Sequence, residues 1–346
     1  MARFPASRYA AAVVATAAIT FAAVLATCGA AVAPAEWLVS AAQGDALFTL
    51  ASEPSPADTD ANLLPNVANG YVGVRLGAAS MYGAGLYVGD GTFYEDFRAA
   101  TRARIPAVSA GLEVFPRGGA VTPVGVALHL RQAVVERLYT MSSPEGGNTT
   151  VSIELYAHRA RRSLLVLQVT VNATQTQPGS TISVPFDVPR FSNNNSDVQF
   201  APAKSPVANT TAFVGRVAKG EVPNAPRPLV ALVATNIPST LQVPSGRVTT
   251  VLYLTALRSE LDTADPLQAA ASDVAEAMAA GQAALRQEHE AAWATLWAGG
   301  VEVQGNMTLA THINSTYYYL LSQNRADFPA PAAPVGTHHW REWEAA

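Results

Sequence analysis

Short apolar runs separated by Pro, Gly and Asn fill the first three quarters of the chain, and several of them alternate apolar with polar residues. The runs predict strands at 111–115, 124–130, 132–141, 150–156, 163–171, 181–186, 229–235 and 247–256. Short strands with turn signals between them indicate a large antiparallel β-sandwich rather than alternating strands and helices. Residues 187–228, which are rich in Pro, Asn and Ser, are predicted to form long surface loops.

Residues 65–91 combine short apolar runs with many glycines. The pair Asn69-Gly70 predicts a tight hairpin turn, because both residue types tolerate the positive φ that such turns need. Strand-forming residues follow at 71–76 and again at 86–88. The glycines are therefore predicted to mark tight turns or places where two backbones approach closely.

The apolar pattern changes to a helical period after Asp265. Asp265 followed by Pro266 is a helix start, with an N-cap and a proline in the first turn. The spacing predicts helices over 267–280 and 282–298, interrupted by Gly281, and a third helix over 308–322. A short strand is predicted at 301–303. The sequence thus indicates a mainly β fold with helices confined to the region after Asp265.

The N-terminus resembles a secretory signal in its composition. Arg3 and Arg8 precede an apolar run over residues 9–33, and Ala33-Pro34-Ala35 fits a cleavage site. Residues 1–35 are therefore predicted to be a signal peptide of a secreted, secretory-pathway, vacuolar or lysosomal protein. The alternative is an uncleaved signal anchor that holds the protein in a membrane through residues 9–33. Glycosylation sequons begin at Asn148, Asn172, Asn194, Asn209, Asn306 and Asn314.

Composition narrows the class of protein further. The 346 residues are 49% hydrophobic and 14% charged, so they can form a sizeable core. Lys204 and Lys219 are the only lysines and the net charge is −4, which argues against nucleic-acid binding. Cys28 is the only cysteine, and the six histidines lack metal-ligand spacing, so neither a metal nor another cofactor is expected.

Six stretches in order resemble glycoside hydrolase family 65. They are ANGYVGVR (68–75), ATRARIPA (100–107), YAHR (156–159), EHEAAWATLW (288–297), GVEVQGN (300–306) and INSTYYYLLSQ (313–323). That family holds acid trehalases, disaccharide phosphorylases and the glucosidase of glucosylgalactosyl-hydroxylysine. The resemblance implies a super-β-sandwich over 36–256, linker helices over 257–299, the start of an (α/α)6 barrel over 300–325 and a disordered tail over 326–346.

The resemblance implies hydrolysis of an α-glucosidic bond with inversion, by a glutamic acid and a general base. The implied substrate is trehalose or a glucosylgalactosyl-hydroxylysine glucoside, which would bind through the barrel. The family's catalytic segments follow the point that matches YYYLLS, and no residue here matches them. No catalytic residue is therefore assigned, and the chain is expected to be an inactive fragment by itself. The alternative function is a non-catalytic β-sandwich that binds carbohydrate or protein.

Several polar residues in the matching stretches are candidate site residues, each with a structural alternative. Asn69, Tyr71 and Arg75 are expected to serve turn and strand chemistry. Arg102 and Arg104 fit sugar or carboxylate binding, but also an interdomain ion pair. His158 and Arg159 indicate a structural corner between two strands.

The acidic and aromatic candidates are weighed in the same way. Glu113, Glu136 and Glu154 lie in predicted strands, where solvated or cross-strand ionic roles are expected, while Glu342 and Glu344 lie in a tail that cannot hold a catalytic pair. The aromatic residues Trp293, Trp297 and Tyr317–Tyr319 could stack on sugars, but helical spacing favours a role in the core. Without barrel helices over them, the linker helices are expected to expose apolar surface and to promote self-association.

Overall fold

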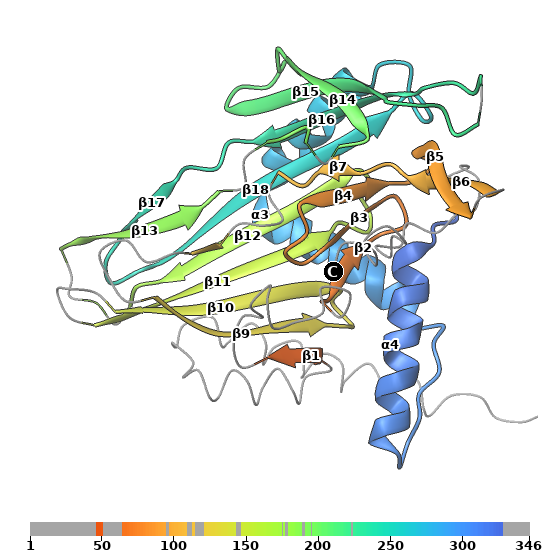
Figure 1. Ribbon diagram of the computed structural model, residues 1–346. Helices are drawn as coiled ribbons and strands as arrows, with labels where there is room; N and C mark the ends of the chain where they lie inside the picture. The colour runs from red at the N-terminus through yellow and green to blue at the C-terminus, as the bar shows by residue number, and fades with distance from the viewer. Residues whose placement is uncertain are drawn as a thin grey trace, which may run out of the picture.

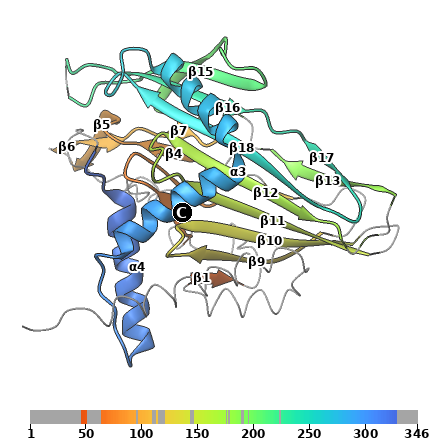
Figure 2. The ribbon, with the colours of Figure 1, turned by 180° about the vertical axis from the view of Figure 1, so that it is seen from behind.

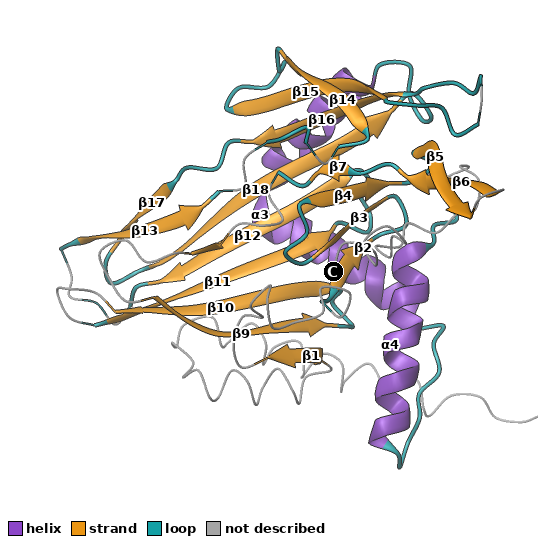
Figure 3. Ribbon diagram, viewed as in Figure 1, coloured by secondary structure: helices purple, strands orange, loops and turns teal. Residues whose placement is uncertain are grey.

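The computed structural model describes residues 46–50, 64–94, 97–108, 113–114, 121–142, 147–174, 176, 179–188, 191–194, 196–222 and 224–327. The predicted signal segment with Cys28 and the tail with His338, His339, Glu342 and Glu344 lie outside these residues, as does the side chain of Glu113. The mainly β class is confirmed: strands dominate, and both helices of the described part follow Asp265 (Figure 3).

Within the described residues, nine antiparallel strands form one large twisted sheet (Figure 1). Their order across the sheet is β1 (Ala46–Leu50), β9 (Val121–His129), β10 (Val134–Ser142), β11 (Asn148–Ala157), β12 (Leu164–Asn172), β18 (Val248–Ser259), β16 (Leu229–Thr235), β15 (Thr210–Val217) and β14 (Val198–Ala203). Because successive side chains of a strand point to opposite faces, each strand contributes to two different cores.

Smaller sheets lie over the front face in Figure 1. One consists of β2 (Asn66–Ala68), β3 (Val72–Arg75), β4 (Ser80–Gly83) and β7 (Ile105–Pro106). The others are β17 (Thr240–Pro244), β13 (Thr181–Asp187) and β8 (Glu113–Val114), and the pair β5 (Tyr87–Tyr94) and β6 (Phe97–Arg102). Val72, Val74 and Ile105 pack there against Ile153 and Leu167 of the large sheet in one buried cluster, so the architecture is a sandwich.

Helix α3 (Pro266–Trp297) covers part of the opposite face, as the reversed view shows (Figure 2). Ala270, Val274 and Ala277 pack there with Leu164 and Val166 in a second buried cluster. The predicted start is confirmed, since Asp265 accepts a hydrogen bond from the Gln268 amide at 3.0 Å. The predicted interruption is also confirmed: Gly281 has φ 75° and ψ 172°, and the helix continues beyond it.

Helix α4 (Met307–Gln323) begins at Asn306, whose side chain accepts a hydrogen bond from the Leu309 amide at 3.0 Å. The helix projects past the edge of the large sheet and reaches the sandwich only with its C-terminal half (Figure 1). Its observed bounds agree with the predicted helix over 308–322 to within one residue at each end.

Two predictions of secondary structure are wrong. The segment 187–228 contains strands β14 and β15 instead of loops alone. Exposed polar residues such as Gln199, Thr211 and Arg216 interrupt the apolar pattern of these strands, yet Val198 and Val217 are buried in the sandwich core. Residues 301–303 do not form a strand: Val301 is 67% exposed, and apolar residues without a neighbouring strand have no ladder to join.

Candidate functional site

Three segments far apart in the sequence meet beside the C-terminal end of α4. They are the turn 69–71 between β2 and β3, the loop 158–163 between β11 and β12, and residues 321–325 at the end of α4; together we call them the junction. Each segment overlaps one of the stretches that resemble family 65, namely ANGYVGVR, YAHR and INSTYYYLLSQ.

Asn69 is the centre of the junction and has no exposed surface. Its side-chain nitrogen donates to the carbonyl oxygens of His158 and Arg162, each at 2.9 Å. Its side-chain oxygen accepts from the amides of Tyr71 and Val72, also at 2.9 Å. All four hydrogen bonds that a buried asparagine amide can offer are therefore made, and they join the turn to the loop.

Arg159 and Arg325 hold the end of α4 against this turn. Arg159 donates to the carbonyls of Asn69 and Leu321 with Nη1 and to that of Asn324 with Nη2, each at 2.9 Å. Arg325 donates in return to the Arg159 carbonyl at 2.7 Å. Burial lowers the pKa of Arg159 to about 10, which still leaves it charged at neutral pH.

Gly70 allows the close approach of α4. It has φ 84°, and a Cβ atom there would lie 2.4 Å from Cγ of Arg325 and 2.7 Å from the carbonyl carbon of Asn324. Only glycine avoids both the strained φ and this collision. The expectation that Asn69 serves turn chemistry is confirmed, and the predicted close backbone approach is found at its neighbour.

Two buried histidines fix the loop to α3 and are neutral. His158 donates from Nε2 to the Leu285 carbonyl at 2.9 Å and accepts the Arg161 amide at Nδ1. His289 donates from Nε2 to the Gln132 carbonyl and accepts the Arg159 amide at Nδ1. Burial lowers the pKa of His158 to about 4 and that of His289 well below its usual value. His158 is thus the structural corner predicted, since both its nitrogens are engaged with backbone.

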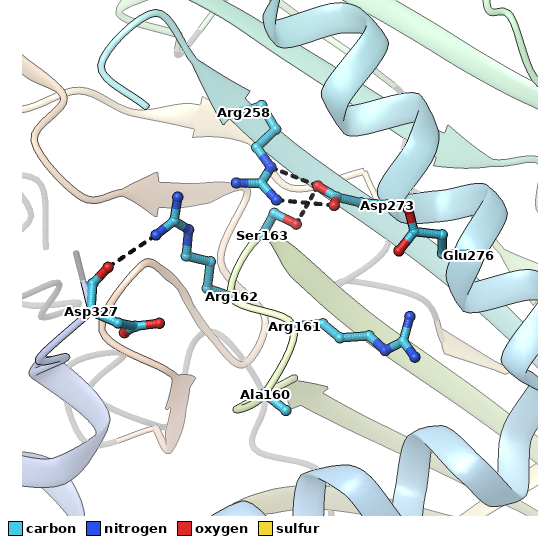
Figure 4. Close-up of a pocket in the computed structure, with 8 residues that line it drawn as sticks. All are labelled: Ala160, Arg161, Arg162, Ser163, Arg258, Asp273, Glu276 and Asp327. Atoms are coloured by element: carbon cyan, nitrogen blue, oxygen red, sulfur yellow. Dashed lines mark hydrogen bonds and ion pairs between the residues drawn. The ribbon is translucent and has the colours of Figure 1, made fainter. Parts of the chain in front are cut away.

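Ion pairs surround the pocket between this loop and α3 (Figure 4). Arg258 binds Asp273 with two hydrogen bonds of 2.6 and 3.0 Å, and the Ser163 hydroxyl donates to the same carboxylate. Asp262 accepts from Arg258 and from the Tyr71 hydroxyl, at 2.9 and 2.8 Å. Sequence reasoning missed these partners, although the cluster of arginines in HRARRS was a signal for an ionic loop.

Glu136 and Glu154 occupy directly opposed positions on β10 and β11. Glu136 interacts with His129 at 3.0 Å, and Glu154 accepts from Gln168 at 2.9 Å and from Arg286 of α3 at 3.1 Å. The expected cross-strand roles are thus confirmed for these two acids. Burial raises the pKa of Glu154 although Arg286 opposes the shift.

The other basic candidates lie within the sandwich. Arg104 binds Asp197 through two hydrogen bonds of 2.9 and 3.0 Å. The expected ion pair therefore forms, but both residues belong to the sandwich, so it is not interdomain. Arg102 forms a hydrogen bond with Tyr87, which it faces on the neighbouring strand, and Arg75 is buried in β3.

The aromatic residues of α3 and α4 belong to the core. Trp293 and Tyr318 are fully buried and stack with ring centres 5.6 Å apart, and the Tyr318 hydroxyl donates to the Asn66 carbonyl. Trp297 and Tyr317 are half-buried and meet edge to face at 5.2 Å. The expected exposure is therefore wrong for Trp293 and Tyr318, which the sandwich and the paired helices cover, whereas Trp297 and Tyr317 keep part of their surface exposed. The expected self-association stays a prediction. Among the large apolar side chains of α4 that the structure describes, Leu309 and Leu320 are exposed.

The six sequons differ in their surroundings. Asn148, Asn194, Asn209 and Asn306 are exposed, whereas Asn172 and Asn314 are half-buried. Asn172 accepts hydrogen bonds from Thr174, and Asn306 caps α4. Glycosylation of all six stays a prediction.

The described residues show two further absences. No group of three or more His, Cys, Asp and Glu side chains in this part of the chain could hold a metal ion. Of the helices in the described ranges, none is long and apolar enough to span a bilayer.

Comparison with known proteins links the chain to glycosidases. Proteins named protein-glucosylgalactosylhydroxylysine glucosidase match it from Dictyostelium discoideum (26% identity, 79% of this chain and 38% of the relative) and Gallus gallus (27%, 83% and 38%). The chain thus spans well under half the length of these relatives. A solved structure, a putative kojibiose phosphorylase from the human microbiome, superposes with a TM-score of 0.57 at 10% identity over 85% of this chain and 41% of that one.

The similarity to that phosphorylase shows that the sandwich fold is shared. The family whose profile matches residues 13–338 is described as "Uncharacterized conserved protein (DUF2152)", and that match covers nearly all of the chain. The chain therefore belongs to the DUF2152 family, and its relationship to glycoside hydrolase family 65, which the six stretches indicated, is confirmed.

Proposed function

We propose that this chain provides the sandwich and linker helices of a glycosidase that hydrolyses the α-glucosidic bond of a glucosylgalactosyl-hydroxylysine glucoside or of trehalose, with inversion. The observation that carries the proposal is the match to relatives named for that glucosidase, over 79% and 83% of the chain. In this role the junction fixes the direction of α4, so that residues following it are held at a constant position relative to the sandwich.

The chemistry supports a division of labour within the enzyme. Inverting hydrolysis needs two carboxyl groups about 6.5–9.5 Å apart in a shielded site, one of them protonated. The acids of the described pocket and sheet are already engaged: Asp262 and Asp273 bind Arg258, and Glu154 binds Arg286. A carboxylate whose oxygens already accept hydrogen bonds from an arginine is not placed to give a proton to the oxygen of a leaving group. We therefore assign catalysis to residues outside the described ranges.

A chimera tests the proposal. The matching segment of the Dictyostelium discoideum relative is replaced by this chain, and glucose release from glucosylgalactosyl-hydroxylysine and from trehalose is measured. We expect activity on at least one substrate, and its loss on Arg159→Met, which removes three hydrogen bonds that orient α4. The matched control is Arg216→Met, at an exposed ion pair with Glu260 that lies outside the junction.

Two results would contradict the proposal. The first is a chimera that is folded by circular dichroism and sedimentation but releases no glucose from either substrate. The second is turnover by the 346-residue chain itself that is abolished by Glu136→Gln or Glu154→Gln, since that would place catalysis on the sheet.

The predicted route through the secretory pathway belongs to the same proposal. It is supported by the composition of residues 1–35 and by the exposure of Asn148, Asn194 and Asn209. Protein purified from its natural source is expected to gain mobility on a gel after endoglycosidase treatment. Unchanged mobility would contradict this part of the proposal.

A further inference from the structure

The pocket in Figure 4 offers hydrogen-bonding groups that the junction does not use. It has a volume of about 280 Å³ and is lined by loop 160–163, Arg258, Asp273, Glu276 and Asp327; we call it the Arg161 pocket. Sites for drug-sized ligands occupy roughly 300–1,000 Å³, so this pocket suits a ligand of about one ring.

On one wall of the pocket, the charged side chains already form hydrogen bonds with each other. Arg258 donates hydrogen bonds to Asp273 and Asp262, and the Ser163 hydroxyl donates to Asp273. Arg258 is 18% exposed and Asp273 20%, and their paired hydrogen bonds fix their geometry. This wall therefore gives the pocket a rigid shape, and its charged groups are paired with each other and not with a ligand.

The other wall presents one donor and one acceptor. Arg161 uses Nε and Nη2 on Glu288, at 2.8 and 3.0 Å, and Glu276 uses Oε1 on the Ser272 hydroxyl at 3.0 Å. Among the described residues, Nη1 of Arg161 and Oε2 of Glu276 have no hydrogen-bond partner, and the two residues do not form an ion pair with each other. Both line the same pocket, from loop 160–163 and from α3.

The charges around the pocket favour a neutral ligand. Three arginines, Arg161, Arg162 and Arg258, are balanced by three carboxylates, Asp273, Glu276 and Asp327. An anion would meet the carboxylates and a cation would meet the guanidinium groups, so neither gains from the site as a whole. A ligand with adjacent hydroxyl groups can donate to a carboxylate and accept from a guanidinium at the same time.

We propose that the Arg161 pocket binds a single neutral sugar ring, with one hydroxyl donating to Oε2 of Glu276 and a neighbouring hydroxyl accepting from Nη1 of Arg161. This binding site is separate from the cleavage of a glucosidic bond. It gives the sandwich a carbohydrate contact of its own, whichever residues carry out hydrolysis.

The test is a titration of the full 346-residue chain with methyl α-D-glucopyranoside, followed by calorimetry or saturation-transfer NMR. We expect a dissociation constant of order millimolar, as for a small polar ligand with few contacts. Glu276→Gln and Arg161→Gln should each weaken binding about tenfold, since each removes one charge-assisted hydrogen bond. Glu276 is exposed, and Arg161→Gln removes one partly exposed ion pair with Glu288, so the melting temperature without sugar should change little in either variant.

Two control variants separate the pocket from general charge effects. Glu302→Gln removes a carboxylate that is 77% exposed and outside the pocket, and it should leave the affinity unchanged. Glu288→Gln breaks the same ion pair as Arg161→Gln but keeps the arginine, and it should retain binding.

Three outcomes would overturn the proposal: the absence of binding, binding that neither pocket variant weakens, and a preference for inorganic phosphate over the sugar. The last would identify an anion site instead. None of these readouts involves hydrolysis, so they leave the test of the proposed function unaffected.

Discussion

Replacing Asn69 by alanine removes four hydrogen bonds at the centre of the junction. Two carbonyl oxygens, of His158 and Arg162, and two amides, of Tyr71 and Val72, lose the Asn69 side chain, which has no exposed surface, as their partner. A buried polar group left without a partner costs about 1–3 kcal/mol. Taking the lower end for each group, since water can enter the new space, we expect Asn69→Ala to lower the free energy of unfolding by about 4 kcal/mol.

Urea unfolding followed by circular dichroism measures this loss, provided that the slope with denaturant is unchanged. The matched control is Asn193→Ala: Asn193 is exposed and donates one partly buried hydrogen bond of 2.9 Å to the Phe200 carbonyl, so its loss should cost about 1 kcal/mol. If the two variants differ by less than about 1 kcal/mol, the four hydrogen bonds do not stabilise the fold as the geometry implies.

Asn69→Asp separates hydrogen bonding from packing. The aspartate keeps the shape and both accepted hydrogen bonds, but it turns two donated bonds into repulsion between a carboxylate and two carbonyl oxygens. The same contacts should raise the pKa of the new carboxyl group. We therefore expect the difference in unfolding free energy between this variant and the native chain to narrow as the pH falls and the group becomes protonated. A difference that is independent of pH would contradict the assignment of the hydrogen bonds.

Three further predictions concern the junction and the sheet. Gly70→Ala should loosen α4 and expose it to limited proteolysis, because the new Cβ collides with residues 324 and 325. Gly246→Ala, the control at φ 72° with open space around it, should leave α4 as resistant as in the native chain, and equal cleavage of the two variants would refute the prediction. Burial raises the pKa of Glu154, so its contribution to stability is lost as the pH rises from about 4.5 through that raised value. The unfolding free energy of Glu154→Gln should therefore fall less over this range than that of the native chain. Parallel plots of unfolding free energy against pH for the two proteins would refute this prediction. The imidazole of His158, with a pKa of about 4, should remain neutral at pH 5.5 by NMR, and protonation there would show that burial does not control it.

The large sheet could be predicted because its strands carry a local pattern. In β12, for example, Leu165, Leu167 and Val169 face the sandwich core while Leu164 and Val166 face α3. The strand therefore begins with apolar residues on both faces, which is typical of a buried strand. Helix α3 was predictable for a similar reason, because Asp265 is its N-cap and Pro266 is its first residue. Strands β14 and β15 were missed because exposed residues interrupt their apolar pattern; β14 is the edge strand of the sheet and β15 is its neighbour.

The junction could be predicted only in part, since many of its acceptors are backbone atoms. Arg159 was recognised as a candidate, but its partners are carbonyl oxygens of Leu321 and Asn324, more than 160 positions away. A backbone carbonyl is present at every residue and leaves no mark on the sequence. Side-chain pairs such as Arg258 and Asp273 were also hidden, because nothing in the sequence says which of several acids reaches which arginine.

The residues that made the family recognisable lie where one position must satisfy several constraints at once. A strand position such as Val169 needs an apolar side chain of about the right volume, and several residue types meet that need. Asn69 must donate twice and accept twice, and Gly70 must take φ 84° with another backbone against its α-carbon. Few residue types can replace either. A short string such as ANGYVGVR is therefore informative because it marks the place where the sandwich holds α4, and the loss of that contact is the defect that we expect to disable the protein first.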